Sequence, residues 1–137
     1  MLARIHSSGA LVLVAVSALL ASGCGGSGTL NAQALTKEST TIASLAAEGA
    51  LLGRNAVSGK TTRIFTRVHS EYLSKAASQG ASSLRTAKAE PSLRPKVRRI
   101  AVLATEISAD LKRLGHASRD EQGRLARDLE AAAKELA

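Results

Sequence analysis

Apolar residues recur every three or four positions in the C-terminal third of the chain, which is the spacing of one face of a helix. Between Pro91 and Gly115 the intervals are 4-3-4-3-4-3, a pattern typical of a coiled-coil seam. Ser92 is the expected N-cap, Pro95 is tolerated in the first turn, and Gly115 is the expected stop. This predicted seam consists of Leu93, Val97, Ile100, Ala104, Ile107, Leu111 and Leu114.

A second strong helix pattern follows at residues 118–137. Ser118 and Glu121 have the spacing of a capping box, in which each side chain accepts a hydrogen bond from the other residue's main-chain amide. Glu130 and Lys134 lie four residues apart, so we expect them to pair on the exposed face. The apolar stripe of this helix is Leu125, Leu129, Ala132 and Leu136.

Two weaker helix patterns precede these and meet near Gly59. Gly49, Gly53 and Gly80 lie inside them, and each costs about 1 kcal/mol relative to alanine in a helix. The first stripe is Leu35, Ile42, Leu45, Leu52 and Ala56; the second is Phe65, Val68, Tyr72, Ala76 and Leu84, in a helix that runs to about Ala89.

Four helices with short connections predict an all-α fold, an antiparallel helical bundle. A three-helix bundle, in which the first two helices run on through Gly59, is the alternative. Alanine fills many seam positions, so we expect thin, closely packed interfaces. Large aliphatic residues and Phe make up only about a fifth of residues 24–137, which predicts marginal stability or stabilisation as a homo-oligomer.

The first 23 residues are typical of an export signal. Arg4 and His6 give a basic start with no acidic residue, and Ala10–Ala21 is an uncharged apolar run of 12 residues. As a helix this run spans roughly 18 Å, which is short of the ~30 Å hydrocarbon core of a bilayer. A basic start, a short apolar run and small residues after it indicate a cleaved signal peptide rather than a permanent membrane span.

The single cysteine, Cys24, follows this run in the sequence "LLASGC". This sequence resembles the lipobox of bacterial lipoproteins: Ser22 and Gly23 match its small positions, and Ala21 stands where the family prefers leucine. The resemblance implies cleavage between Gly23 and Cys24. It also implies a diacylglyceryl group on the Cys24 thiol, with palmitate or similar acyl chains, and a location on the extracytoplasmic face of the cell membrane.

This resemblance divides the chain into three parts. Residues 1–23 are the signal peptide, residues 24–30 a Gly/Ser-rich tether, and residues 31–137 the bundle domain. Glycine and serine in Gly25–Gly28 favour a flexible tether. The mature domain loosely resembles small helical actinobacterial lipoproteins of unknown function, a resemblance that implies no site residues.

The chain has a net charge of +8, one Phe, one Tyr and no Trp. The near absence of aromatic residues disfavours a module that stacks nucleic-acid bases, so we expect no nucleic-acid partner. One cysteine cannot form an internal disulfide.

Positive charge is concentrated in residues 85–99, which hold six basic residues and one acid, Glu90. We call this segment the basic loop, because its two prolines predict a connection between the second and third helices. If a lipid fixes the start of the first helix at the membrane, the second helix returns there and the basic loop faces the membrane. A solvated loop with no function is the alternative. The residues expected to contact an anionic surface are Arg85, Lys88, Arg94, Lys96, Arg98 and Arg99.

Other motifs do not predict chemistry. The sequence "SGKTT" (Ser58–Thr62) has Arg54 where a phosphate-binding loop requires its first glycine, and no strand pattern precedes it. Glu106 and Asp110 share a helix face, and Asp120 and Glu121 start a helix, but no carboxylate–histidine motif completes a metal site. We therefore expect no enzyme activity, no metal, and no cofactor beyond the lipid on Cys24.

The sequence thus predicts an exported, lipid-anchored protein whose bundle is a binding or structural module at the cell envelope. Its expected partners are anionic lipid, a cell-wall polymer or an envelope protein. The alternative is a carrier that holds a small molecule or haem between helices near Phe65, His69 and Tyr72. Against haem, the mature chain lacks a methionine and the C-x-x-C-H motif, and His116 lies at a different height.

Overall fold

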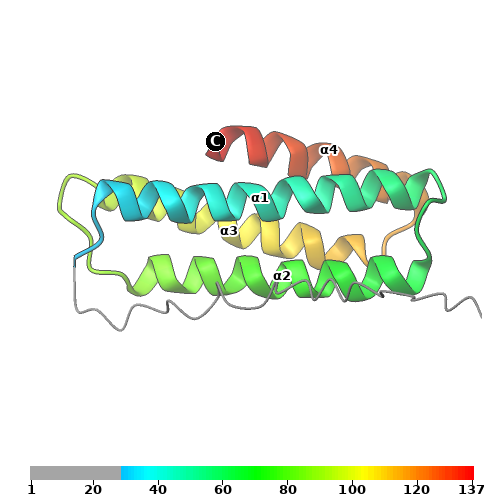
Figure 1. Ribbon diagram of the computed structural model, residues 1–137, viewed down its shortest axis with the longest axis horizontal. Coiled ribbons are helices and arrows are strands. Elements are labelled where there is room, and N and C mark those ends of the chain that lie inside the picture. The colour runs from blue at the N-terminus through cyan, green and yellow to red at the C-terminus, as the bar shows by residue number, and fades with distance from the viewer. Residues whose placement is uncertain (1–28) are drawn as a thin grey trace, which may run out of the picture.

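A computed structural model of the protein describes residues 29–137 and contains four helices. Helix α1 spans Ala32–Val57, α2 spans Arg63–Thr86, α3 spans Arg94–Leu114 and α4 spans Arg119–Leu136. Consecutive helices are antiparallel (Figure 1). The predicted all-α helical bundle is confirmed.

The chain turns between α1 and α2 at residues 58–62, so the three-helix alternative is wrong. Gly59 has a φ of 73°, in the left-handed region that glycine adopts without a steric penalty. Thr62 then caps α2, because its side chain accepts a hydrogen bond from the main-chain N–H of Phe65 at 3.2 Å. The "SGKTT" motif is therefore a turn between two helices.

The two ends of the bundle have different connections (Figure 1). We call the end that contains Leu30 and residues 87–93 the entry pole, because the chain enters α1 there. The other end, the distal pole, contains the connections at residues 58–62 and 115–118.

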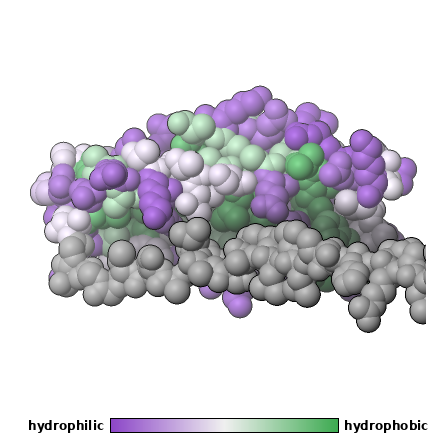
Figure 2. Space-filling view, viewed as in Figure 1, coloured by the Kyte–Doolittle hydropathy of each residue, from purple (hydrophilic) through white to green (hydrophobic). Residues whose placement is uncertain are grey.

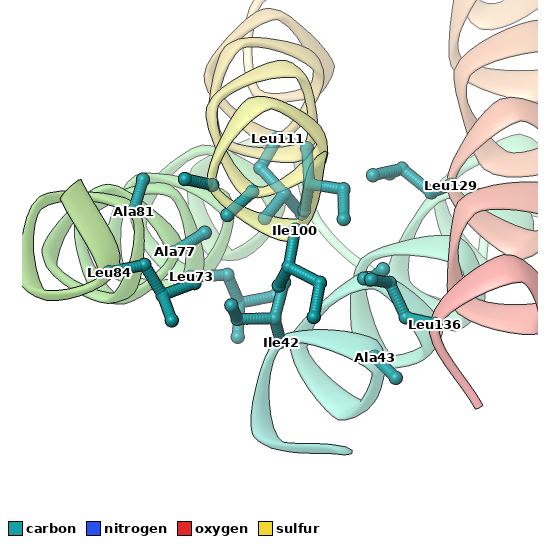
Figure 3. Close-up of a cluster of buried hydrophobic side chains, with 14 of the residues drawn as sticks. Ile42, Ala43, Leu73, Ala77, Ala81, Leu84, Ile100, Leu111, Leu129 and Leu136 are labelled. Carbon is teal, nitrogen blue, oxygen red and sulfur yellow. The ribbon is translucent and has the colours of Figure 1, made fainter. Parts of the chain in front are cut away.

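The four helices do not contact one another equally. Helix α1 packs along α4, and α2 packs along α3. Helices α1 and α3 also touch across the bundle, whereas α2 and α4 make no contact within residues 29–137. Figure 3 shows the resulting cross-section, in which α1 and α3 lie between α2 and α4.

The core follows the predicted seams in three of the helices. Six of the seven seam residues of α3 are buried, and Leu93 is half-buried. In α1, Leu35, Ile42 and Leu52 are buried, with Leu45 and Ala56 half-buried. In α4, Leu125, Leu129 and Leu136 are buried, with Ala132 half-buried.

Glycine on α1 permits a close approach to its neighbours. A Cβ atom on Gly49 would collide with the Leu111 side chain, and one on Gly53 would lie 2.9 Å from the Cβ of Ala126. Both glycines are buried within a continuous helix. Their cost in helix propensity is therefore offset by packing against α3 and α4 that a larger residue would prevent.

The predicted core face of α2 is wrong except at Leu84, which is buried. Phe65, Val68 and Tyr72 are 52%, 58% and 62% exposed, and Ala76 is half-buried. The helix also ends at Thr86, before the predicted Ala89. Besides Leu84, the buried face consists of Thr66, Ser70, Leu73, Ser74, Ala77 and Ala81.

Hydroxyl groups on the buried face of α2 are all paired. Thr66 and Ser70 donate to main-chain carbonyls one turn earlier, those of Thr62 (3.0 Å) and Arg67 (2.9 Å). Ser74 and Ser108 each donate to the other's main-chain carbonyl, at 2.8 and 2.9 Å. Small, satisfied hydroxyl residues can therefore take the place of large apolar ones and let α2 and α3 pack closely.

The N-terminal caps of α3 and α4 differ in detail from the predicted ones. Leu93, not Ser92, is the N-cap of α3 and makes no side-chain capping bond, while Pro95 lies in the first turn as expected. Ser118 caps α4 by accepting from the N–H of Glu121 at 3.4 Å. The Glu121 carboxylate instead accepts hydrogen bonds from Arg113 and Arg124, so the capping box is only half formed.

Candidate functional site

The basic loop lies beside the point where the chain enters the bundle. The N–H of Leu30 donates to the carbonyl of Lys88 at 2.6 Å, and the N–H of Glu90 donates back to the carbonyl of Leu30 at 3.5 Å. These bonds form a short parallel bridge between Leu30 and Ala89. The predicted position of the loop, at the same end as the start of the first helix, is confirmed.

All six predicted basic residues are exposed, and α3 divides them into two groups. Arg85, Lys88, Arg94 and Arg98 line a groove between the end of α2 and the start of α3. Lys96 and Arg99 instead line a second hollow, shared with the C-terminal residues of α4. The structure therefore brings four of the six together and separates the other two.

The groove at the entry pole has a volume of about 1150 Å³ and an apolar lining that sequence reasoning missed. Leu84 lies at the end of α2 and Val97 on the first turns of α3, so their approach depends on how these helices pair. Val102 lies outside the predicted seam and is 55% exposed. The spacing pattern gave no reason to single it out. The main apolar residues of the groove are Leu84, Val97, Ala101 and Val102.

The basic side chains around the groove are not neutralised by carboxylates. Arg85 donates to the Thr105 hydroxyl at 2.6 Å, and Arg94 donates to the carbonyl of Ala89 at 3.4 Å. Among residues 29–137, no ion pair involves any of the four cations, and Glu90 is the one acid in the lining. Arg99 provides a contrast, because it pairs with Glu135 at 2.7 Å. The groove therefore keeps an uncompensated positive charge.

Hydropathy alone does not distinguish the two poles. Figure 2 shows hydrophilic residues at both ends of the bundle and apolar residues in the middle of the same face. Each pole has two helix N-termini and two C-termini, so their macrodipoles largely offset one another. At the distal pole, Arg113 pairs with Asp110 and Glu121, and Arg124 pairs with Glu121. Lys60, Arg63, Lys112 and Arg119 at the same pole form no ion pair within residues 29–137. The entry pole is therefore distinguished not by charge pairing but by the grouping of four cations around one groove.

The aromatic residues considered for a carrier lie on the outer surface of α2. His69 stacks with Phe65 and Tyr72, with ring centroids 5.3 and 6.3 Å apart, and its Nε2 lies 2.7 Å from the Glu48 carboxylate. Phe65 and Tyr72 are more than half exposed, so these rings do not meet between helices as the carrier alternative required. His116 lies 3.6 Å from Glu71.

The carboxylates considered for metal chemistry are dispersed. Asp110 is half-buried, and burial raises its pKa, an effect that the nearby Arg113 partly offsets. Glu130 is held by Lys134 at 3.0 Å, as predicted, and by Arg54 at 2.9 Å, and both cations lower its pKa. In the part of the chain that the structure describes, no three His, Cys, Asp or Glu side chains are placed to hold a metal ion.

The predicted lipid site lies outside the described residues. Gly23 and Cys24, the predicted export signal and most of the predicted tether belong to residues 1–28. Among the four helices of residues 29–137, none is both long enough and apolar enough to cross a bilayer. No protein-family model, curated protein or solved structure matches this chain.

Proposed function

We propose that this protein is an exported lipoprotein, anchored through lipidated Cys24 on the extracytoplasmic face of the cell membrane. Its bundle is a binding module that rests the entry pole on an anionic membrane surface. The observation that carries this proposal is the hydrogen bond between Leu30 and Lys88, because it ties the basic loop to the anchored end of the bundle.

The length of the tether supports this placement. Thr29 follows Cys24 by five residues, so a fully extended tether spans at most about 18 Å. Thr29 also lines the groove with the four cations. A lipid on Cys24 would therefore hold these cations within reach of the headgroups of the surrounding bilayer.

The two membrane contacts have different roles. Each buried lipid methylene contributes about 0.8 kcal/mol, and each basic residue near an anionic surface contributes on the order of 1 kcal/mol. Two acyl chains bury many methylenes, so the lipid determines whether the protein stays on the membrane. The basic residues determine which end of the bundle faces the membrane.

Removal of the thiol tests the lipid anchor. Cells that express either the wild type or Cys24→Ser are fed a fatty acid with an alkyne tag, and the protein is followed in the membrane and soluble fractions. The proposal predicts that the wild type carries the tag and that Cys24→Ser is untagged and uncleaved before residue 24. A Cys24→Ser protein that is processed and tagged like the wild type would overturn it.

A further inference from the structure

The groove at the entry pole combines two kinds of lining. One side is apolar: Leu84 from α2 and Val97 and Ala101 from α3, which are 2%, 5% and 3% exposed, form its floor, and Val102 of α3 forms its exposed edge. Val102 is 55% exposed, so part of this apolar surface is left in contact with water. Burying such surface against hydrocarbon is favourable, and exposed apolar surface within a polar rim is typical of a binding site.

The other side of the groove is cationic. Arg85, Lys88, Arg94 and Arg98 face one acid, Glu90, which leaves a net charge of +3 on the lining. Arg85 and Arg94 use their hydrogen bonds to protein on neutral oxygen atoms. A guanidinium has five N–H donors in a planar fork, so both retain donors for a phosphate or carboxylate oxygen.

A ligand that matches both linings has an anionic group with several oxygen atoms next to a hydrocarbon part. A free phosphate would leave the apolar lining wet, and an uncharged hydrocarbon would leave the cations without a partner. A diffuse attraction to a charged surface requires neither a groove nor an apolar lining. The groove also contains Thr29, within about 18 Å of Cys24 along an extended tether.

We propose that this groove binds one anionic glycerophospholipid of the membrane. The phosphodiester lies among Arg85, Arg94 and Arg98, where bidentate arginine contacts suit its oxygen atoms. The upper part of the acyl chains lies against exposed Val102, above the floor that Leu84, Val97 and Ala101 form. This inference rests on the proposed function, because Cys24 would supply the membrane from which the lipid is taken, and it adds a discrete site for one lipid per bundle.

Photo-crosslinking of the full lipidated protein tests the site. The protein is reconstituted in phosphatidylcholine vesicles that contain a trace of phosphatidylglycerol with a diazirine high on one acyl chain, and labelled peptides are mapped by mass spectrometry. The site predicts labelling concentrated in residues 84–102, roughly ten-fold above labelling by the matching phosphatidylcholine probe. Equal labelling by the two probes, or labelling spread over both poles, would contradict it.

Matched variants separate the groove from total charge. Arg94→Gln with Arg98→Gln should lower phosphatidylglycerol labelling about ten-fold, whereas Lys60→Gln with Arg63→Gln at the distal pole removes the same charge and should leave it unchanged. Val102→Gln should lower labelling with all charges intact. Circular dichroism of each variant verifies the fold. Equal losses in the two double variants would overturn the site.

Two soluble competitors distinguish the membrane lipid from other phosphate sources. Millimolar glycerol 3-phosphate or a poly(glycerol phosphate) should not displace the lipid probe, because neither fills the apolar lining. Displacement by the first would assign the groove to a free phosphate, and displacement by the second to a wall polymer. Fatty-acid tagging at Cys24 is measured in the same samples, so a lost groove signal with an intact tag contradicts the lipid site alone.

Discussion

The main-chain N–H of Leu30 donates a hydrogen bond of 2.6 Å to the carbonyl of Lys88, so the segment before α1 and the basic loop are joined. Because consecutive helices are antiparallel, this bond places the α2–α3 connection at the end where the chain enters the bundle. Four cations and an apolar groove lie at that end. An anchor on Cys24 would turn all of them toward the membrane.

The surroundings of two helical glycines, Gly49 on α1 and Gly123 on α4, predict opposite effects of substitution by alanine. Gly49→Ala should lower the free energy of unfolding by about 1–2 kcal/mol, because the added methyl group collides with the buried Leu111 side chain. Gly123→Ala, whose added Cβ would be 3.7 Å from Val57, should raise it by up to about 1 kcal/mol through helix propensity. Urea denaturation measures both, and a Gly49→Ala protein as stable as Gly123→Ala would contradict this packing.

The reciprocal hydrogen bonds between Ser74 and Ser108 predict coupling between α2 and α3. Each single change, Ser74→Ala or Ser108→Ala, should cost about 1 kcal/mol of stability. The double variant should cost less than the sum, because the two hydroxyl groups also contact each other at 3.2 Å. Exposed Ser82→Ala is the matched control and should have little effect. Additive losses would show that the two serines act independently.

The pH dependence of stability has a predicted sign at Asp110. Burial raises the pKa of this carboxyl, so the folded protein binds its proton more tightly than the unfolded chain does. Stability is then lost as the pH rises through the carboxyl range, and the loss persists at neutral pH. Asp110→Asn should therefore raise the free energy of unfolding at pH 7 by less than about 1 kcal/mol, with a slight rise in the thermal midpoint.

Arg113 contacts both Asp110 and Glu121. In Asp110→Asn we expect it to keep its ion pair with Glu121, at 2.9 Å in the wild type, so the loss of the Asp110 charge leaves Arg113 with a partner. The difference between Asp110→Asn and the wild type should shrink at about pH 3, where the wild-type carboxyl is protonated. Calorimetry at the two pH values measures this. A variant less stable than the wild type at pH 7 would show that the Arg113 contact outweighs the cost of burial.

The sequence predicts α3 and α4 well because their core positions carry large aliphatic residues at intervals of three and four. The face of α2 could not be found in this way, because its aromatic residues lie outside and its core positions include Thr66, Ser70 and Ser74. These hydroxyl residues recur every four positions, which is the spacing of one helix face. A search for large apolar residues alone does not find this pattern. Their burial depends on hydrogen bonds that only the folded helices supply.

The sequence also predicts one part of the candidate site, the basic loop, but not the groove. The density of basic residues in residues 85–99 and the alternation of helix directions suffice to place the basic loop. The groove requires the relative position of two helices, since Leu84 and Val97 are brought together only by the pairing of α2 with α3. Likewise, the separation of Arg99 from the groove depends on the position of Glu135 on α4.

The orientation of the bundle on a bilayer tests the central claim most directly. Lipidation would occupy the thiol of Cys24, so a cysteine introduced by Ser92→Cys at the entry pole or Lys60→Cys at the distal pole is the only free thiol for a fluorophore. Helix α1 has 26 residues and separates the two poles by about 39 Å. Each labelled protein is reconstituted in vesicles containing phosphatidylglycerol and a headgroup-attached nitroxide quencher.

We predict strong quenching of the label at position 92 and weak quenching at position 60, with the difference reduced in vesicles of phosphatidylcholine alone. Equal quenching at the two positions, or stronger quenching at position 60, would contradict the claim that the basic entry pole faces the membrane.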